Sequence, residues 1–185
     1  MSSQESVRLL IFFAIAIAVV LLIRNMRNPA PVPDKASQAS GERAPAESNY
    51  TYVNRVRGLK RGQPQLVEMF GTHCGPCKQM VPHMAGLTKK YPDVFIMSCS
   101  SDPIEQIETF VNENPQAKLV NIARDHGDVS GLMQRLGQTG IPHAFLFDAT
   151  GKMVWHGHPA QAEPYVRQQA AKADGWASAG KGRRL

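Results

Sequence analysis

Apolar residues form one long run near the N-terminus and then a series of short clusters that begins at about residue 50. From there on, continuous apolar runs, typical of buried strands, alternate with segments whose apolar positions recur every three or four residues, typical of helices. The predicted strands are 66–70, 94–97, 118–123, 144–147 and 153–156. The predicted helices are 51–61, 77–91, 103–112, 129–136 and 163–172. This alternation, closed by a hairpin and a helix, predicts an α/β domain with a mixed sheet over residues 50–172.

Two helix predictions depend on local detail. Ser101 is expected to cap the helix that follows it, because a serine hydroxyl can accept a hydrogen bond from a free N–H of the first turn. Pro103 suits that first turn, since its missing N–H has no partner there in any case. The helix over 51–61 depends only on the spacing of three apolar residues, Val53, Val56 and Leu59.

The long apolar run extends from Leu9 to Ile23 without a polar residue. A membrane-spanning helix needs about 17 to 25 residues. Residues 7–23 reach the lower limit if the charged end of Arg8 extends to the membrane surface. A cleaved signal peptide is the alternative, but Arg24 follows the run where small residues usually form the cleavage site. We therefore favour a single uncleaved transmembrane anchor.

The remaining segments carry little apolar pattern. Residues 1–6 form a short N-terminal segment. Residues 24–49 are rich in Pro, Ala and Ser and predict a flexible linker. Residues 173–185 are small and basic and predict a disordered tail. The chain is thus expected to hold one anchor, one linker and one globular domain.

The net charge of +6 raises the question of nucleic-acid binding. Within residues 50–172, however, 13 Lys and Arg stand against 10 Asp and Glu, with no basic stripe or interleaved aromatic residues. Nucleic-acid binding is therefore not expected.

Two of the three cysteines stand close together in the segment FGTHCGPCKQMVP, residues 70–82. Cys74 lies where a predicted strand passes into a helix, and free N–H groups and the helix dipole stabilise a thiolate at a helix N-terminus. Cys77 lies one turn further, where it is shielded and can resolve a mixed disulfide. Gly75 and Pro76 form a tight turn that keeps the two sulfurs close. This arrangement favours redox chemistry.

Other uses of a cysteine pair require other neighbours. Haem attachment needs His directly after the second cysteine, where this chain has Lys78. A structural zinc site needs a second ligand pair, which Cys99 alone does not supply, and we expect Cys99 to be a small buried residue. A Cu(I) site formed by His73, Cys74 and Cys77 stays open, since thiolates are soft ligands, as does a pair that merely packs.

Residues 63–82, QPQLVEMFGTHCGPCKQMVP, resemble thioredoxin-fold proteins: an apolar strand, an aromatic residue, C-G-P-C, and a proline five residues after the second cysteine. Residues 139–148, TGIPHAFLFD, look like the loop that carries a cis-proline opposite the active-site disulfide in this superfamily. The segment DATGKMVWHGH at 148–158 is similar to the terminal hairpin of the membrane-tethered, TlpA-like branch. The resemblance covers residues 50–172 and implies a thioredoxin fold, a central mixed sheet flanked by helices, behind one N-terminal transmembrane helix.

The resemblance implies a role for each matching residue. Cys74 is the attacking thiolate and Cys77 the resolving thiol, so the redox-active disulfide between them takes the place of any cofactor. Glu68 stands where thioredoxins place a buried acid; a carboxylate in an apolar strand should have a raised pKa and could take the proton of Cys77. The alternative for Glu68 is an exposed position at a sheet edge. Pro142 is expected to be cis, which leaves the Ile141 backbone free to pair with an extended substrate segment.

His73 departs from this pattern, because thioredoxin-fold proteins usually have Trp directly before the first cysteine. A titratable group here replaces a flat apolar docking surface. We hypothesise that protonated His73 lowers the pKa of Cys74 through its positive charge; otherwise it shapes docking. The expected substrate-binding residues are His73, Gly75, Pro76, Ile141 and Pro142, and no metal ligand is assigned.

The sequence therefore predicts a membrane-anchored thiol–disulfide oxidoreductase, and above all a reductase of proteins outside the cytoplasmic membrane. Apocytochrome c thiols are one class of client, as in cytochrome c maturation. Because the periplasm is oxidising, such a reductase needs electrons from a membrane partner such as a transmembrane thiol–disulfide transporter. The alternatives are a copper-handling module and a disulfide oxidase or isomerase.

The expected location is the inner (cytoplasmic) membrane with the domain facing the periplasm. The charges near the anchor conflict with this orientation. Arg24 and Arg27 follow the span, whereas only Arg8 and the terminal amine precede it, so the positive-inside rule places the domain in the cytoplasm. The sequence leaves the orientation open.

Overall fold

The computed structural model describes residues 15–17 and 41–181 of the 185 residues, with side chains described up to residue 173. Residues 15–17 form a helical turn. The rest of the predicted anchor 7–23 and the predicted linker as far as residue 40 lie outside the described residues. Among the helices that the structure describes, none is both long enough and apolar enough to cross a membrane.

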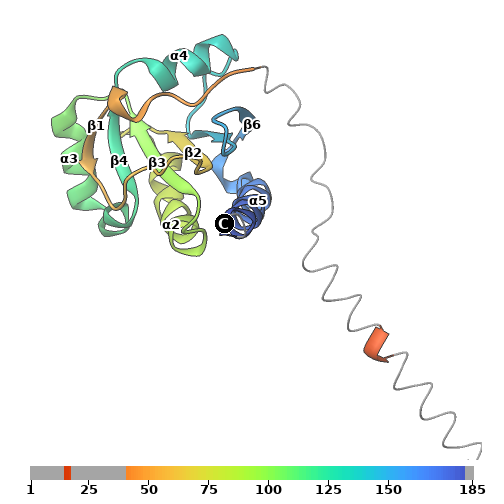
Figure 1. Ribbon diagram of the computed structural model, residues 1–185. Coiled ribbons are helices and arrows are strands. Elements are labelled where there is room, and N and C mark those ends of the chain that lie inside the picture. Colours follow the sequence, from red (N-terminus) through yellow and green to blue (C-terminus); the bar gives the residue numbers. More distant parts are fainter. Residues whose placement is uncertain (1–14, 18–40, 182–185) are drawn as a thin grey trace, which may run out of the picture. The chain divides into compact units, whose positions relative to one another are not determined.

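A six-stranded mixed sheet forms the centre of the domain (Figure 1). In spatial order its strands are β1 (Tyr50–Asn54), β4 (Asn121–Asp125), β3 (Phe95–Ser100), β2 (Gln65–Met69), β5 (His143–Phe147) and β6 (Met153–Gly157). The three central strands β4, β3 and β2 run parallel, whereas β1, β5 and β6 are antiparallel to their neighbours. The predicted α/β domain with a mixed sheet and a terminal hairpin is confirmed.

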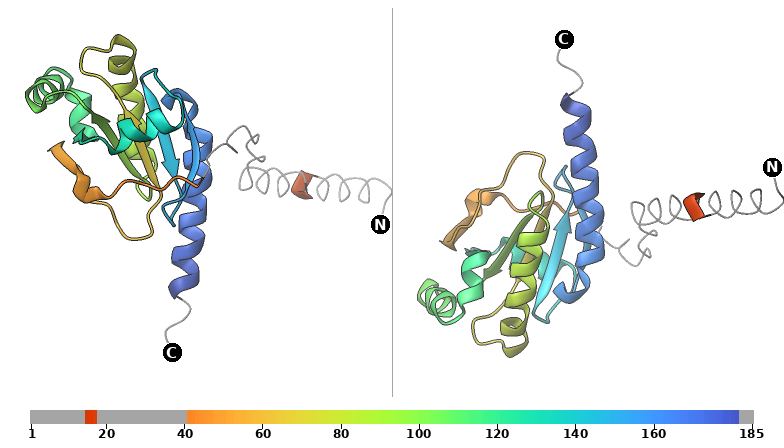
Figure 2. Two further views of the ribbon diagram at one scale, coloured as in Figure 1. Left: turned by 90° about the horizontal axis from the view of Figure 1, so that it is seen from above. Right: turned by 90° about the horizontal axis from the view of Figure 1, so that it is seen from below.

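Helices cover both faces of this sheet (Figures 1 and 2). They are α2 (Gly75–Lys90), α3 (Ile104–Glu113), α4 (Asp128–Arg135) and α5 (Glu163–Lys181), with short 3-10 helices at η1 (Glu47–Asn49), η2 (Pro115–Leu119) and η3 (Pro159–Gln161). Side chains of α2, α3 and α5 pack in one hydrophobic cluster with the sheet face that carries Leu66 and Ile96. Side chains of α4 pack in a second cluster with the opposite face, which carries Val67 and Met97.

The alternation of side chains along β2 decides where its single acidic residue points. Successive side chains of a strand face opposite sides of the sheet, so Glu68 shares the face of Leu66. That face is covered by α2. A carboxylate therefore enters the hydrophobic layer between the sheet and the helix that begins at the cysteine pair.

The predicted helix over 51–61 is wrong, because residues 50–54 form β1 at the edge of the sheet and residues 55–64 contain no helix. β1 begins with three aromatic or β-branched residues, Tyr50, Thr51 and Tyr52, a composition that favours a strand once a partner strand is available. The partner is β4, which lies about 70 residues further along the chain and which the local spacing of apolar residues cannot reveal.

Two buried or half-buried asparagines hold the chain that leaves β1 in this extended form. The side-chain amide of Asn54 donates to the Val120 carbonyl at 2.6 Å. The side-chain carbonyl of Asn121 accepts the N–H groups of Val56 at 2.8 Å and Arg57 at 3.0 Å, and its amide donates to the Ile96 carbonyl at 2.9 Å. These backbone groups thus find partners outside any helix.

Two helix ends also differ from prediction. Ser101 does not cap α3: its hydroxyl lies 3.4 Å from the Asp125 carboxylate, and Pro103 occupies the capping position without a side-chain bond. The last helix, α5, continues to Lys181, past the predicted end near Lys172 and into the segment predicted as a disordered tail. The segment contains three alanines, which favour helix more than any other residue type.

We expect Asn121→Ala to lower the free energy of unfolding by about 2 kcal/mol, because the substitution leaves two backbone N–H groups and a carbonyl without their partner. Urea denaturation of the two proteins measures the difference. Asn112→Ala is the matched control, since Asn112 is exposed, and it should change the midpoint little. Equal midpoints for all three proteins would contradict the role of Asn121.

Candidate active site

Cys74 and Cys77 form a disulfide at the point where the chain enters α2. Their Cα atoms are 5.2 Å apart. Cys74 is the N-cap residue of the helix, and its sulfur accepts the backbone N–H of Cys77 at 3.2 Å. Gly75 and Pro76 form the exposed first turn.

The two sulfurs differ in exposure. Cys77 is buried, whereas Cys74 is only partly covered. When the pair is reduced, Cys74 is therefore the thiol that a large substrate can reach, and the N–H groups of the first turn of α2 favour its thiolate. Cys77 is placed to attack a disulfide formed at Cys74 from inside.

The loop before β5 lies against the exposed cysteine. The peptide bond between Ile141 and Pro142 is cis, as the resemblance implies. The carbonyl oxygen of Ile141 is 3.9 Å from the Cys74 sulfur. Pro142 is buried, while the Ile141 side chain is 38% exposed, so an apolar surface borders the disulfide on this side.

Gly71 leaves room for the Ile141 side chain beside Cys74, and the sequence analysis did not select this glycine. A Cβ atom at residue 71 would lie 2.9 Å from the Ile141 Cδ1 atom and 3.5 Å from the Cys74 Cβ atom. The first distance is closer than real Cβ atoms come to their neighbours, so a larger residue would push the Ile141 side chain away from the cysteine. The only sequence signal was a glycine directly after the buried strand.

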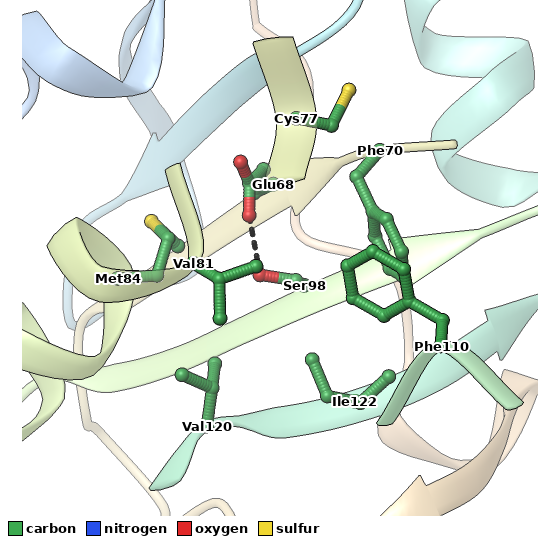
Figure 3. Close-up of a pocket in the computed structure, with 9 residues that line it drawn as sticks. All are labelled: Glu68, Phe70, Cys77, Val81, Met84, Ser98, Phe110, Val120 and Ile122. Atoms are coloured by element: carbon green, nitrogen blue, oxygen red, sulfur yellow. Dashed lines mark hydrogen bonds between the residues drawn. The ribbon is translucent and has the colours of Figure 1, made fainter. Parts of the chain in front are cut away.

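Glu68 lies on the α2 side of the sheet and lines the same cavity as Cys77 (Figure 3). It is almost fully buried, at 3% exposure, so the alternative of an exposed edge position is wrong. Burial raises the pKa of Glu68 to about 7, although a hydrogen bond from Ser98 acts in the opposite direction. A small enclosed cavity is lined by the side chains of Glu68, Phe70, Cys77, Val81, Met84, Ser98, Phe110, Val120 and Ile122.

Asp102 is a second acidic residue of the site, and the sequence suggested no such role for it. Its carboxylate accepts the backbone N–H of Thr72 at 2.7 Å and the Thr72 hydroxyl at 2.8 Å. Burial by itself raises the pKa of Asp102, but the hydrogen bonds from Thr72 and Ser100 and the positive charge of His73 outweigh it and hold the pKa below its ordinary value. A negative charge is thus fixed against the loop that leads into Cys74.

His73 is exposed at the rim of the site. It lies between Thr72, which Asp102 holds, and Cys74. A protonated His73 and the Asp102 carboxylate therefore act on the Cys74 sulfur with opposite signs. A cation favours the thiolate and an anion disfavours it.

Two histidines lie next to the cis-proline loop, one on β5 and one on β6. His143 directly follows Pro142, and its Nε2 atom lies 3.1 Å from Nδ1 of His156 on the neighbouring strand β6. Burial, and then the positive charges that His156 and His158 can carry, lower the pKa of His143 to about 4. At neutral pH both rings are uncharged and can share an N–H···N hydrogen bond across β5 and β6.

The third cysteine lies apart from the disulfide, in the second hydrophobic cluster. Cys99 is completely buried, as expected, and packs with its sulfur 3.9 Å from that of Met69. Over the described residues, no group of three or more His, Cys, Asp or Glu side chains is arranged to hold a metal ion. The copper alternative with His73, Cys74 and Cys77 concerns the reduced pair, whereas the structure holds the disulfide, so it stays a prediction.

Comparison with known proteins agrees with this geometry. The family model described as Thioredoxin matches residues 47–143, just over half of the chain. The mitochondrial thioredoxin-3 of Saccharomyces cerevisiae is 33% identical over 63 residues, which are 30% of this chain and 50% of that protein. The chain therefore matches only half the length of this relative.

Two further relatives extend the comparison. The thiol-disulfide oxidoreductase ResA of Bacillus thuringiensis is 28% identical over 130 residues, 65% of this chain and 70% of that protein. The crystal structure of a thiol-disulfide isomerase from Corynebacterium glutamicum superposes with a TM-score of 0.53 at 19% identity, over 64% of this chain and 86% of that one. At this identity the superposition shows the fold alone, and the expected thioredoxin fold is confirmed.

We expect Asp102→Asn to lower the pKa of Cys74 by about half a unit to one unit, because it removes a nearby negative charge while an amide oxygen can still accept from Thr72. If protonated His73 favours the Cys74 thiolate, as hypothesised, His73→Gln should raise the pKa of Cys74. The measurement is the rate of Cys74 alkylation in the reduced protein as a function of pH.

Asp148→Asn is the matched control for this experiment. The Asp148 carboxylate also accepts a threonine N–H and hydroxyl, those of Thr150, but in the turn between β5 and β6. The Asp148→Asn substitution should leave the pKa of Cys74 unchanged. An Asp102→Asn protein that is folded and titrates like the wild type would show that Asp102 does not act on the cysteine.

Proposed function

This chain belongs to the thioredoxin family, and we propose that it is a membrane-anchored thiol–disulfide oxidoreductase that reduces disulfides in proteins outside the cytoplasmic membrane. The observation that carries the proposal is the asymmetry of the cysteine pair. Cys74 is accessible beside the Ile141 backbone, and Cys77 is buried next to an acid with a pKa of about 7. An accessible nucleophile and a shielded resolving thiol are what a two-step exchange requires.

In the first step, the Cys74 thiolate attacks one sulfur of the substrate disulfide. A mixed disulfide forms between Cys74 and the substrate, and the other substrate sulfur leaves as a thiolate that takes a proton from solvent. The exposed Ile141 and its carbonyl border this sulfur, so an extended substrate segment can pair with the backbone there.

In the second step, Glu68 accepts the proton of Cys77, and the Cys77 thiolate attacks the sulfur of Cys74. The bond between Cys74 and the substrate breaks, and the second substrate thiol is released. The protein ends with the Cys74–Cys77 disulfide, and two electrons have passed from its dithiol to the substrate. The disulfide form in the structure is this end state.

The similarity to the oxidoreductase ResA supports thiol–disulfide exchange as the reaction, and the Gly-Pro pair between the cysteines resembles that of reducing thioredoxins. The apolar run within residues 7–23 supports the anchor, and we place the domain on the periplasmic side of the inner membrane because the proposed clients lie there. A reductase on that side must be reduced again, so we propose a thiol–disulfide transporter in the membrane as electron donor. Oxidised apocytochrome c is the client class we propose, as part of cytochrome c maturation.

Cys74→Ser is expected to reduce the rate of model-disulfide reduction by the chemically reduced protein to that of the uncatalysed reaction, because the attacking sulfur is gone. Cys77→Ser should still attack but accumulate a mixed disulfide that mass spectrometry detects. Cys99→Ser is the matched control and should leave the rate unchanged, since Cys99 is buried away from the pair. A Cys74→Ser protein with the wild-type rate would end the proposal.

The location is tested by labelling cysteines in intact cells with a membrane-impermeant maleimide. If the domain is periplasmic, Cys74 should be labelled before the cells are lysed. Labelling without further treatment indicates a reduced pair at rest, and labelling only after an impermeant reductant indicates a resting disulfide. The Cys74→Ser chain gives the background. Labelling only after lysis would place the domain in the cytoplasm, as the positions of Arg24 and Arg27 suggest.

A further inference from the structure

The two carboxylate oxygens of Glu68 lie in different surroundings. Oε2 accepts a hydrogen bond from the hydroxyl of Ser98 (Figure 3). Oε1 is buried and has no hydrogen-bond partner among the described residues. Both residues line the same small cavity as Cys77. One carboxylate oxygen thus accepts a hydrogen bond, and the other has none.

Ser98 owes its position to the pairing of two parallel strands. It is the direct neighbour of Glu68 in the register between β2 and β3, so both side chains point to the α2 face. Ser98 is 4% exposed. Apart from Glu68, Cys77 and Ser98, the cavity is lined only by apolar side chains. Within the described part of the chain, the Ser98 hydroxyl is therefore the single hydrogen-bond donor to the Glu68 carboxylate.

We propose that Ser98 is a positioning residue of the exchange reaction: it holds Oε2, so that Oε1 is the oxygen that takes the proton of Cys77. The inference rests on the proposed function, because it concerns the second step of that reaction. Ser98 does not touch the reacting sulfurs and acts only through Glu68.

The proton balance of this step shows what Ser98 contributes. Before the step, Cys77 carries its proton and Glu68 must be ionised to accept it. Afterwards Glu68 is protonated on Oε1 and the Cys77 sulfur is bonded to Cys74, while the leaving substrate sulfur takes a proton from solvent. The cavity has a volume of only about 10 Å³, roughly enough for one water molecule.

The hydrogen bond also sets how much of the acid is ionised. Burial disfavours the carboxylate form of Glu68, and the bond from Ser98 favours it. Without the hydroxyl only the effect of burial would remain, and the pKa of Glu68 would rise. Near neutral pH, a higher pKa leaves fewer molecules with an ionised base, and resolution by Cys77 slows.

The test compares the pH dependence of model-disulfide reduction by the full chain, purified in detergent and reduced beforehand, between pH 6 and 9. For Ser98→Ala we expect the rise in rate with pH to shift upward by about one unit, a loss of roughly fivefold at pH 7 that disappears at pH 9. Ser98→Thr keeps the hydroxyl and should restore the wild-type profile. Ser98→Cys places a weaker donor of similar size there and should shift the pH profile less than Ser98→Ala. It replaces Ser98→Ala in the test if that variant does not fold.

Two controls separate this role from a merely structural one. Thr88→Val removes another buried hydroxyl, one that bonds only to the Met84 carbonyl of its own helix, and should leave the profile unchanged. Glu68→Gln should be slow at every pH and insensitive to substitution of Ser98. A carbon-13 NMR titration of the Glu68 carboxyl in the disulfide form should show the same upward shift for Ser98→Ala, without any dependence on activity.

The outcomes distinguish the inference from the proposed function. If the wild type reduces disulfides and Glu68→Gln is slow, but folded Ser98→Ala has the wild-type pH profile and carboxyl titration, the role of Ser98 is wrong and the proposed function stands. If the wild type does not reduce disulfides, the proposed function fails. The carboxyl titration then still decides whether Ser98 sets the ionisation of Glu68.

Discussion

The burial of one carboxylate between the sheet and α2 is the constraint on which the active site depends. A carboxylate in a hydrophobic layer is costly unless its charge is compensated or neutralised. In this protein the compensation is partial: Ser98 satisfies one oxygen of Glu68, and the other remains without a partner beside Cys77. The result is an acid with a pKa of about 7, which can both accept and release a proton near neutral pH. The surrounding core makes this possible, because its apolar side chains desolvate the carboxyl group.

The exposed half of the site has the opposite character. Cys74 is reached from solvent and lies next to charged groups: Asp102, held in place by Thr72, and His73 at the rim. The helix N-terminus adds its own stabilisation of a thiolate. The polar groups near Cys74 are thus screened by solvent, whereas Cys77 shares a cavity with the buried carboxyl group of Glu68. A single disulfide therefore connects two different electrostatic environments.

The site was predictable where its chemistry is local in the sequence. The cysteine pair, the acid six residues before it and the proline of the later loop could be selected because each has a distinctive neighbourhood. Ser98, Asp102 and Gly71 could not, because serine, aspartate and glycine at strand ends are common and have many uses. Their roles arise from contacts across strands and loops, such as the register that places Ser98 beside Glu68. The error at 51–61 has the same origin. The partner strand β4 and Asn121 lie far from this segment in the sequence, and Asn54 cannot be told from an ordinary surface residue.

The sequence by itself determined the order of strands and helices from β2 onward, the α/β class, the redox pair and the buried acid, because apolar periodicity and the spacing of reactive residues are properties of neighbouring positions. Only the tertiary structure decided which oxygen of Glu68 is free, which carboxylate holds Thr72 in the loop before Cys74, and how His143 and His156 pair. These features depend on which strands are adjacent and on the register between them. A shift of one residue in that register would turn Ser98 to the opposite face of the sheet and leave Glu68 without its partner.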